Sequence, residues 1–246
     1  PLGDLTHFTC PSVPQPRVDT NDPSARITVR THWFPEETEL PRSAWRYADP
    51  LHVELDGGFA PGAIYNVVYR SADPLVIGLG FLAIRDAAAF LRWAPASSGN
   101  PCDGEIDRAY LYGQSQNGRF IRHMLHLGLD EDEQGRVVFD AIWNHIAGAR
   151  RGEYNMRFGQ PSLMSSRSLA MLPPFADVDL FARMAGHRRV PKVFTTNTAW
   201  EYWRGDASLV HTDIAGTRDA EPPGFGRIYF FAGTQHTAGP IPPLPA

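Results

Sequence analysis

The sequence predicts an α/β fold with a mostly parallel sheet and helices on both faces of that sheet. Strand-like and helix-like stretches alternate along the chain, as they do in folds of this class. Three chemically suggestive residues each follow a predicted strand, which is where parallel sheets carry functional groups. The composition is globular, with 43% hydrophobic and 20% charged residues, and 246 residues fit one domain of ordinary or generous size.

The first half of the chain predicts two strands and a helix. Residues 26–32 alternate in polarity and residues 63–70 are rich in β-branched and aromatic side chains, so both are expected to be strands of the main sheet. The proline-, acid- and glycine-rich residues 33–62 between them are interpreted as an excursion from that sheet. Residues 79–93 are expected to form a helix, because apolar residues recur there at helical spacing: Phe81, Ile84, Ala88 and Leu91.

The second half predicts a strand, a helix and three further strands. Residues 106–113 are expected to be a strand, and the helix after them carries the apolar stripe Phe120, Met124 and Leu127 and stops at Gly128. The later strands are expected in the second half of 137–149 and at the starts of 192–203 and 227–236. In domain terms, residues 1–56 are an irregular N-terminal segment with an excursion, and residues 57–246 form the core, with a loop-rich insertion at about 152–190.

The bulk properties exclude several classes of function. The net charge is 23 − 27 = −4, which argues against a dedicated nucleic-acid binder, and no apolar run is long enough to cross a bilayer. The N-terminus lacks signal-peptide features, and the localisation is not readable from it. Two cysteines, Cys10 and Cys102, are too few for a disulfide scaffold. The sequence is equally compatible with a disulfide between them and with two free thiols. No phosphate loop, dinucleotide fingerprint or EF-hand pattern appears, so we expect no cofactor and no metal.

Three residues at predicted strand ends suggest a catalytic site. Ser115 follows AYLYGQ, Glu201 follows VFTTNTAW and His236 follows IYFFAGTQ. Because parallel strands bring their carboxyl ends to one edge of a sheet, we expect the three side chains to meet there. The chain order of serine, acid and histidine is that of the α/β-hydrolase triad.

Each of these residue types has a part in the chemistry of nucleophilic hydrolysis. A serine hydroxyl is a weak nucleophile until a histidine takes its proton, and a buried carboxylate orients the imidazole. The turn GQSQNG is close to a nucleophile elbow, in which small residues at Gly113 and Gly118 let strand and helix approach. The backbone N–H of Gln116, at the start of the helix, is a candidate oxyanion donor.

Each of the three predicted catalytic residues also has an alternative interpretation. A serine between a strand and a helix is commonly an N-cap, and a lone histidine is more often structural. Asp206 and Asp213 lie in the same region as Glu201 and compete for the role of the acid. Glu201 is preferred because it directly follows the strand and has aromatic neighbours that could shield it from water: Trp200, Tyr202 and Trp203.

Several segments resemble a known family. YGQSQNGRFIRHMLHLG, DAIWNHIAGARRGEYNMRFGQPS, TNTAWEYWRGDASLVHTD and IYFFAGTQH together resemble bacterial proteins known mainly as alpha/beta hydrolase domain-containing proteins. The resemblance covers roughly residues 57–239. It implies an α/β-hydrolase fold, with Ser115 as nucleophile, His236 as base and Glu201 as the acid. Relative to this family the chain is expected to be truncated, with its sheet incomplete at the N- and C-termini.

The elbow departs slightly from the family pattern. The usual turn resembles G-x-S-Q-S-G-R, and Asn117 stands here in place of its second serine. The side chain at position 117 is expected to face the helix rather than the substrate. The turn also resembles, more weakly, the G-x-S-R-x-G-K elbow of glucuronoyl esterases, which suggests ester hydrolysis without naming the acyl group.

Other polar clusters are interpreted as structural first. His123 and His126 lie three residues apart on the predicted helix and are read as its polar edge rather than as half of a metal site. His145, Arg150 and Arg151 follow a predicted strand. They are candidates for binding an anionic substrate group, although bracing salt bridges are the favoured interpretation.

The sequence therefore predicts a serine hydrolase, most plainly a carboxylic-ester hydrolase acting on a small-molecule ester. A peptidase or an acyltransferase on the same triad is the first alternative. The second is a catalytically silent hydrolase-fold domain that binds a partner or ligand. Neither nucleic acid nor membrane is an expected partner, and the oligomeric state is open.

Overall fold

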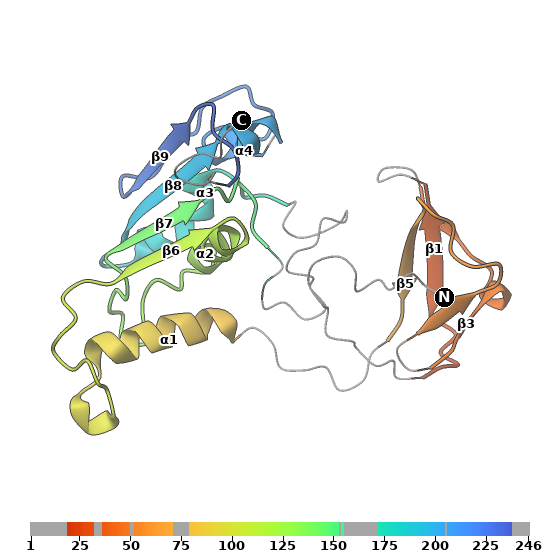
Figure 1. Cartoon of the computed structure of the whole chain (residues 1–246), viewed down its shortest axis with the longest axis horizontal. Coiled ribbons are helices and arrows are strands. Elements are labelled where there is room, and N and C mark those ends of the chain that lie inside the picture. Colours follow the sequence, from red (N-terminus) through yellow and green to blue (C-terminus); the bar gives the residue numbers. More distant parts are fainter. Residues whose placement is uncertain are drawn as a thin grey trace, which may run out of the picture. The chain divides into compact units, whose positions relative to one another are not determined.

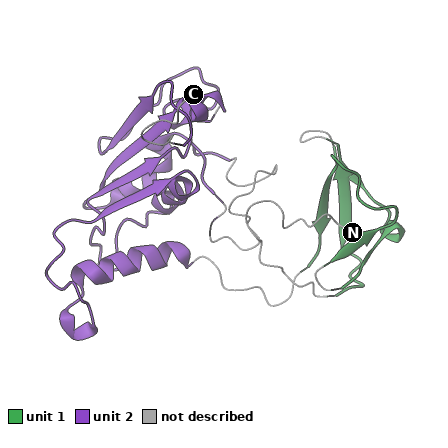
Figure 2. Cartoon of the chain, viewed as in Figure 1, with its two compact units in different colours: residues 1–77, 156–166 green, residues 78–155, 167–246 purple. Residues whose placement is uncertain are grey.

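The computed structural model describes residues 19–31, 36–49, 52–70, 79–152, 154, 172–204 and 206–237. These residues fall into two compact units (Figure 2). The first unit contains the described residues before position 78, and the second contains those of 78–155 and 167–246.

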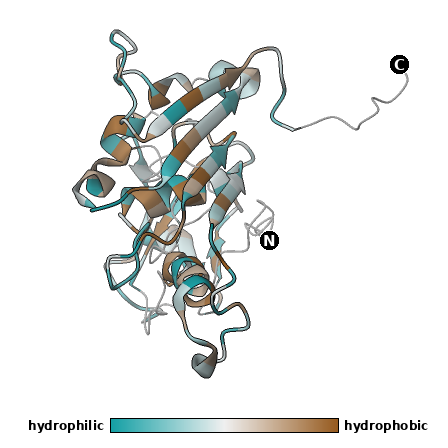
Figure 3. Ribbon diagram, turned by 90° about the vertical axis from the view of Figure 1, so that its left-hand side faces the viewer, coloured by the Kyte–Doolittle hydropathy of each residue, from teal (hydrophilic) through white to brown (hydrophobic). Residues whose placement is uncertain are grey.

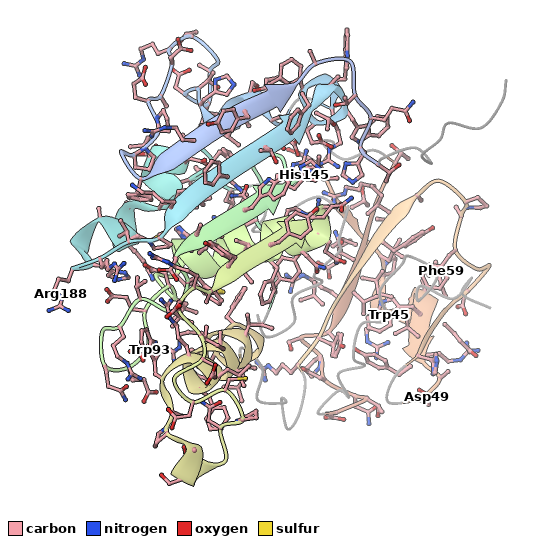
Figure 4. All side chains as sticks on the ribbon, turned by 60° about the vertical axis from the view of Figure 1, so that its left-hand side comes forward. Trp45, Asp49, Phe59, Trp93, His145 and Arg188 are labelled. Carbon is pink, nitrogen blue, oxygen red and sulfur yellow. The ribbon has the colours of Figure 1, made fainter. Side chains whose placement is uncertain are left out.

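The described part of the first unit contains two small antiparallel sheets. In the larger one, β1 (Arg26–Arg30) pairs with β2 (Thr38–Glu39) and with β5 (Ile64–Val68). The smaller one pairs β3 (Trp45–Tyr47) with β4 (Val53–Leu55), and the 3₁₀ turn η2 (Arg42–Ala44) precedes it. The described residues of this unit include a hydrophobic cluster around the buried side chains Ala25, Ile27 and Trp45. Trp45 is labelled in Figure 4.

The prediction that the first two strands belong to the main parallel sheet is wrong. Val68 pairs with Arg26 and Ile64 with Arg30, so the two strands run antiparallel in a sheet of their own. The physical reason lies in the pattern of β1, which places Ile27 in the apolar cluster while the next side chain, Thr28, donates to Glu37 at 2.7 Å. Strands with one apolar and one polar face suit antiparallel sheets, whereas strands of parallel sheets are usually apolar on both faces.

The second unit contains the predicted parallel sheet. Its strands follow the order β6-β7-β8-β9, and every neighbouring pair is parallel. Figure 1 shows them side by side. Their bounds are Tyr110–Gln114, Ala141–His145, Lys192–Thr198 and Gly226–Phe231. The strands predicted in the second half of the chain are thereby confirmed, and their carboxyl ends lie at one edge of the sheet.

Among the described residues of this unit, four helices and three 3₁₀ turns precede or connect these strands. The helices are α1 (Gly80–Trp93), α2 (Gln116–His126), α3 (Asp177–Leu180) and α4 (Ala199–Trp203). The turns are η3 (Ala96–Ser98), η5 (Ala182–Gly186) and η6 (Ser208–Val210). Residues of α1, α2 and α3 share one hydrophobic core with β7 and β8, which includes Phe81, Ile121, Met124, Ile142, Leu180 and Val193. Hydrophobic residues recur along these elements (Figure 3).

Helix α1 buries a different stripe from the predicted one. Phe81 is buried as expected, but Ile84 and Leu91 are exposed, and Arg92 is buried instead. The guanidinium of Arg92 is stabilised by the carboxylate of Asp140 at 2.9 Å and by the carbonyl of Val138 at 2.9 Å. Apolar spacing cannot reveal a buried arginine, because the spacing carries no information about a partner far along the chain.

Helix α2 is anchored beneath the sheet by a buried ion pair. Arg122 is fully buried, and its guanidinium lies 2.5 Å from the carboxylate of Asp177 at the start of α3. The hydroxyl of Thr195 on β8 donates to the same carboxylate at 2.6 Å. A buried charge is costly unless it is paired, so this network ties α2 to α3 and β8. Helix α2 ends at His126, and the predicted stop residue Gly128 follows two residues later with a φ of 73°, which suits glycine.

The described residues also bear on the predictions about membrane crossing and about the two cysteines. None of the described helices is long and apolar enough to cross a bilayer. Cys102 has a free thiol, while Cys10 lies outside the described residues.

Candidate active site

Ser115 lies at the junction of β6 and α2 in a strained backbone conformation. Its φ of 55° and ψ of −115° are unusual for a residue with a side chain. Hydrogen bonds on both sides hold the turn, because the N–H of Ser115 donates to the carbonyl of His145 at 2.9 Å and its carbonyl accepts the N–H of Arg119 at 2.9 Å. Non-glycine residues in such conformations cluster at functional sites.

Two glycines make this sharp turn sterically feasible. A Cβ added to Gly113 would lie 2.6 Å from the carbonyl oxygen of Asn117 and 2.6 Å from the side chain of Ile121. A Cβ on Gly118 would lie 2.9 Å from the carbonyl oxygen of His145 on the neighbouring strand. The close approach of strand and helix predicted for these glycines is therefore present in the structure.

Gly113→Ala is expected to lower the free energy of unfolding by about 1–3 kcal/mol, because the added methyl group overpacks the turn. Urea denaturation followed by circular dichroism measures the loss. Gly186→Ala is the matched control, since a Cβ at Gly186 meets no atom within 4 Å. Equal stability of the two variants would contradict the steric role of Gly113.

The three residues predicted at strand ends converge. The Oγ of Ser115 lies 2.8 Å from the Nε2 of His236, and the Nδ1 of His236 lies 2.5 Å from the Oε1 of Glu201. Ser115 follows β6, Glu201 lies on α4 directly after β8, and His236 follows β9. The resulting chain of hydrogen bonds runs from hydroxyl to imidazole to carboxylate across 121 residues of sequence.

Glu201 is held as a buried carboxylate by the start of its own helix. Its Oε2 accepts the backbone N–H of Thr198 at 2.8 Å and the hydroxyl of Thr198 at 2.5 Å, in a capping box. Burial raises the pKa of Glu201, but the hydrogen bonds from Thr198 and His236 outweigh it, so the pKa lies below its ordinary value. The carboxylate is therefore ionised at neutral pH while it faces the imidazole.

The competing acids have other partners. Asp206 is buried and pairs with Arg150 at 3.1 Å and with Arg204 at 2.8 Å. Asp213 accepts hydrogen bonds within its own turn, where the backbone N–H of Thr217 is the main cause that lowers its pKa to about 2. Of the three candidates that the sequence left open, Glu201 is the one within hydrogen-bond distance of His236.

Gln116 is the first residue of α2, so its backbone N–H points out of the helix N-terminus beside Ser115. This is the direction in which an oxyanion donor must lie. The carbonyl of Gln116 accepts the hydroxyl of Tyr154 at 2.5 Å.

His145 ends β7 next to the turn, where it is labelled in Figure 4. Its Nδ1 lies 2.8 Å from the hydroxyl of Thr196. Burial lowers the pKa of His145, the nearby Glu201 opposes this effect, and the nearby His236 adds to it. The carbonyl of His145 also accepts the N–H of Ser115 at 2.9 Å, so this residue helps to hold the nucleophile turn.

The two arginines after β7 have structural partners. Arg150 forms the ion pair with Asp206, and Arg151 donates to the carbonyls of Leu172 and Pro173 at 3.2 Å each. These contacts agree with the bracing interpretation. A substrate contact of Arg150, Arg151 or His145 stays a prediction.

The expectation that His123 and His126 form a polar helix edge is wrong for His123. His123 is buried against Phe81, and burial is the main cause that lowers its pKa to about 4. The Nδ1 of His126 bonds the carbonyl of Leu180 at 3.2 Å. Within the described part of the chain, no three His, Cys, Asp or Glu side chains are grouped as a metal site would need.

Sequence reasoning missed two residues of the site, Thr198 and Tyr154. The spacing of Thr198 and Glu201 is that of a capping box, which is a readable signal for the support of the acid. Tyr154 has no local signal, because it reaches the turn only through the tertiary fold.

Comparison with known proteins identifies the family to which the fold belongs. A family model described as an alpha/beta hydrolase domain matches residues 16–244. No curated protein and no solved structure matches the chain significantly. The matched range covers most of the sequence, and the parallel sheet has the fold that the family implies. The chain belongs to the alpha/beta hydrolase domain family, which indicates a hydrolase.

Proposed function

We propose that the protein is a serine hydrolase that cleaves carboxylic esters, with Ser115 as nucleophile, His236 as general base and Glu201 as the orienting acid. The observation that carries the proposal is the unbroken hydrogen-bond chain, with 2.8 Å from Ser115 to His236 and 2.5 Å from His236 to Glu201. A hydroxyl placed against an imidazole that a carboxylate holds is the arrangement that activates a serine.

The proposed reaction has two halves. The Oγ of Ser115 attacks the ester carbonyl while the Nε2 of His236 takes the hydroxyl proton, and the N–H of Gln116 donates to the oxygen that becomes negative. The imidazolium then gives its proton to the departing alcohol, and the acyl group remains bound to Ser115. Water repeats the cycle on the acyl-enzyme, so that the acid is released and Ser115 is restored.

Glu201 has an electrostatic part in both halves. The ionised carboxylate stabilises the imidazolium that forms each time His236 takes a proton. It also fixes the proton on Nδ1, so that Nε2 is free of a proton and faces Ser115 as the base. Both effects depend on the rigid placement of Glu201 by Thr198.

The proposal is tested by labelling the protein with a fluorophosphonate probe and locating the adduct by mass spectrometry. We expect one adduct, on the peptide that contains Ser115, because the probe reacts with serines activated by a base. Boiled protein is the control for non-specific labelling. Absence of labelling on the folded chain would contradict the proposal and favour a silent binding domain. A panel of p-nitrophenyl esters, peptides and acyl acceptors separates an esterase from a peptidase or an acyltransferase.

A further inference from the structure

Tyr154 contacts the backbone of the nucleophile turn from outside the triad. Its hydroxyl donates to the carbonyl of Gln116 at 2.5 Å, and its side chain is only 8% exposed. The ring packs among the aromatic side chains of α1 and α2, with centroid distances of 5.4 Å to Phe120 and 6.4 Å to Phe81. The hydroxyl therefore approaches the turn from a rigid, desolvated position.

The hydrogen bond of Tyr154 completes the anchoring of the peptides around Gln116. The peptide before Gln116 is held through the carbonyl of Ser115, which accepts the N–H of Arg119 at 2.9 Å. The peptide after it is held through its carbonyl by Tyr154. With both flanking peptides fixed, the direction of the Gln116 N–H is fixed as well, since two dihedral angles decide it.

We propose that Tyr154 is a positioning residue for the hydrolysis, which keeps the N–H of Gln116 aimed at the developing oxyanion. The inference rests on the proposed function of Ser115 and Gln116. Donors aimed in advance at the transition-state charge are effective because they need no reorganisation during the reaction. A loosened donor still binds the substrate, but it stabilises the transition state less.

The test compares Tyr154→Phe with the wild type, since phenylalanine keeps the ring packing and removes only the hydroxyl. With p-nitrophenyl acetate as substrate, kcat is expected to fall by about 10-fold while KM changes by less than about 2-fold. The inhibition constant of phenylboronic acid, whose adduct with Ser115 places an oxygen at the oxyanion site, is expected to weaken by the same factor. The pH midpoint of kcat/KM should stay unchanged, because the Tyr154 hydroxyl acts on the carbonyl of Gln116, whereas the titrating imidazole of His236 is held by Ser115 and Glu201.

Tyr65→Phe is the matched control. The hydroxyl of Tyr65 also bonds a backbone group, the N–H of Ala60 at 3.0 Å, but it belongs to the first unit. The Tyr65→Phe variant is expected to leave kcat and boronate inhibition unchanged. A Tyr154→Phe variant that melts at a lower temperature yet keeps wild-type kcat and boronate inhibition would overturn the positioning role. If the wild type is labelled at Ser115 in that case, the proposed hydrolase function stands. If the wild type is not labelled, both proposals fail.

Discussion

Ser115→Ala is expected to lower kcat for p-nitrophenyl acetate by about 10⁶-fold, which leaves only the rate that binding and the oxyanion donor provide. The reason is that alanine removes the attacking atom, the Oγ of Ser115 that lies 2.8 Å from the Nε2 of His236. The measurement is steady-state hydrolysis at pH 7.5, together with loss of fluorophosphonate labelling. Circular dichroism establishes that the variant is folded.

Two comparisons make this result specific. Ser98→Ala removes an exposed hydroxyl of the same unit that bonds the carbonyl of Pro95 at 2.7 Å, and it is expected to retain full activity. The double variant Ser115→Ala/His236→Ala is expected to be no slower than either single variant, because residues that act as one unit are not additive. A Ser115→Ala variant that keeps a tenth of the wild-type activity would exclude Ser115 as the nucleophile.

Glu201→Gln is expected to lower kcat by about 10³–10⁴-fold. Glutamine keeps the size of the side chain but removes the negative charge, so the imidazolium of His236 loses its stabilising partner and the tautomer of His236 is no longer specified. The same ester assay measures the effect. Asp213→Asn is the control, because Asp213 bonds its own turn, and it should change kcat by less than about 2-fold. A larger loss in Asp206→Asn or Asp213→Asn than in Glu201→Gln would assign the acid elsewhere.

The difference in stability between the wild type and the Glu201→Gln variant should also depend on pH in a defined direction. Because the folded-state pKa of Glu201 lies below its ordinary value of 4.5, the ionised carboxylate stabilises the fold above pH 4.5. This contribution is lost as the pH falls through the lowered folded-state pKa. The difference in the free energy of unfolding between wild type and variant is therefore expected to shrink below pH 4.5, as measured by urea denaturation at pH 7 and pH 3.

The strands that carry the site could be predicted from sequence because they are local patterns with strong punctuation. The elbow at Ser115 has a strand before it, a helix after it and glycines on both sides, and the strands before Glu201 and His236 are rich in β-branched and aromatic residues. The sequence pattern places the first two strands in the main sheet, which is wrong, because the pattern of a strand does not identify its partner strand. β1 and β5 pair with each other, and only the tertiary arrangement reveals that.

The sequence by itself determined the order of the candidate catalytic residues along the chain. A serine lies on a strand-to-helix turn, an acid follows a later strand, and a histidine follows the last predicted strand. The sequence left the acid open among Glu201, Asp206 and Asp213, because all three lie in one short region. The tertiary structure decided which of them faces His236, at 2.5 Å, and it placed Tyr154 on the carbonyl of Gln116. The physical reason is that periodicity and turn chemistry act over a few residues, whereas a hydrogen bond needs atoms within about 3 Å, which only the packed fold brings together.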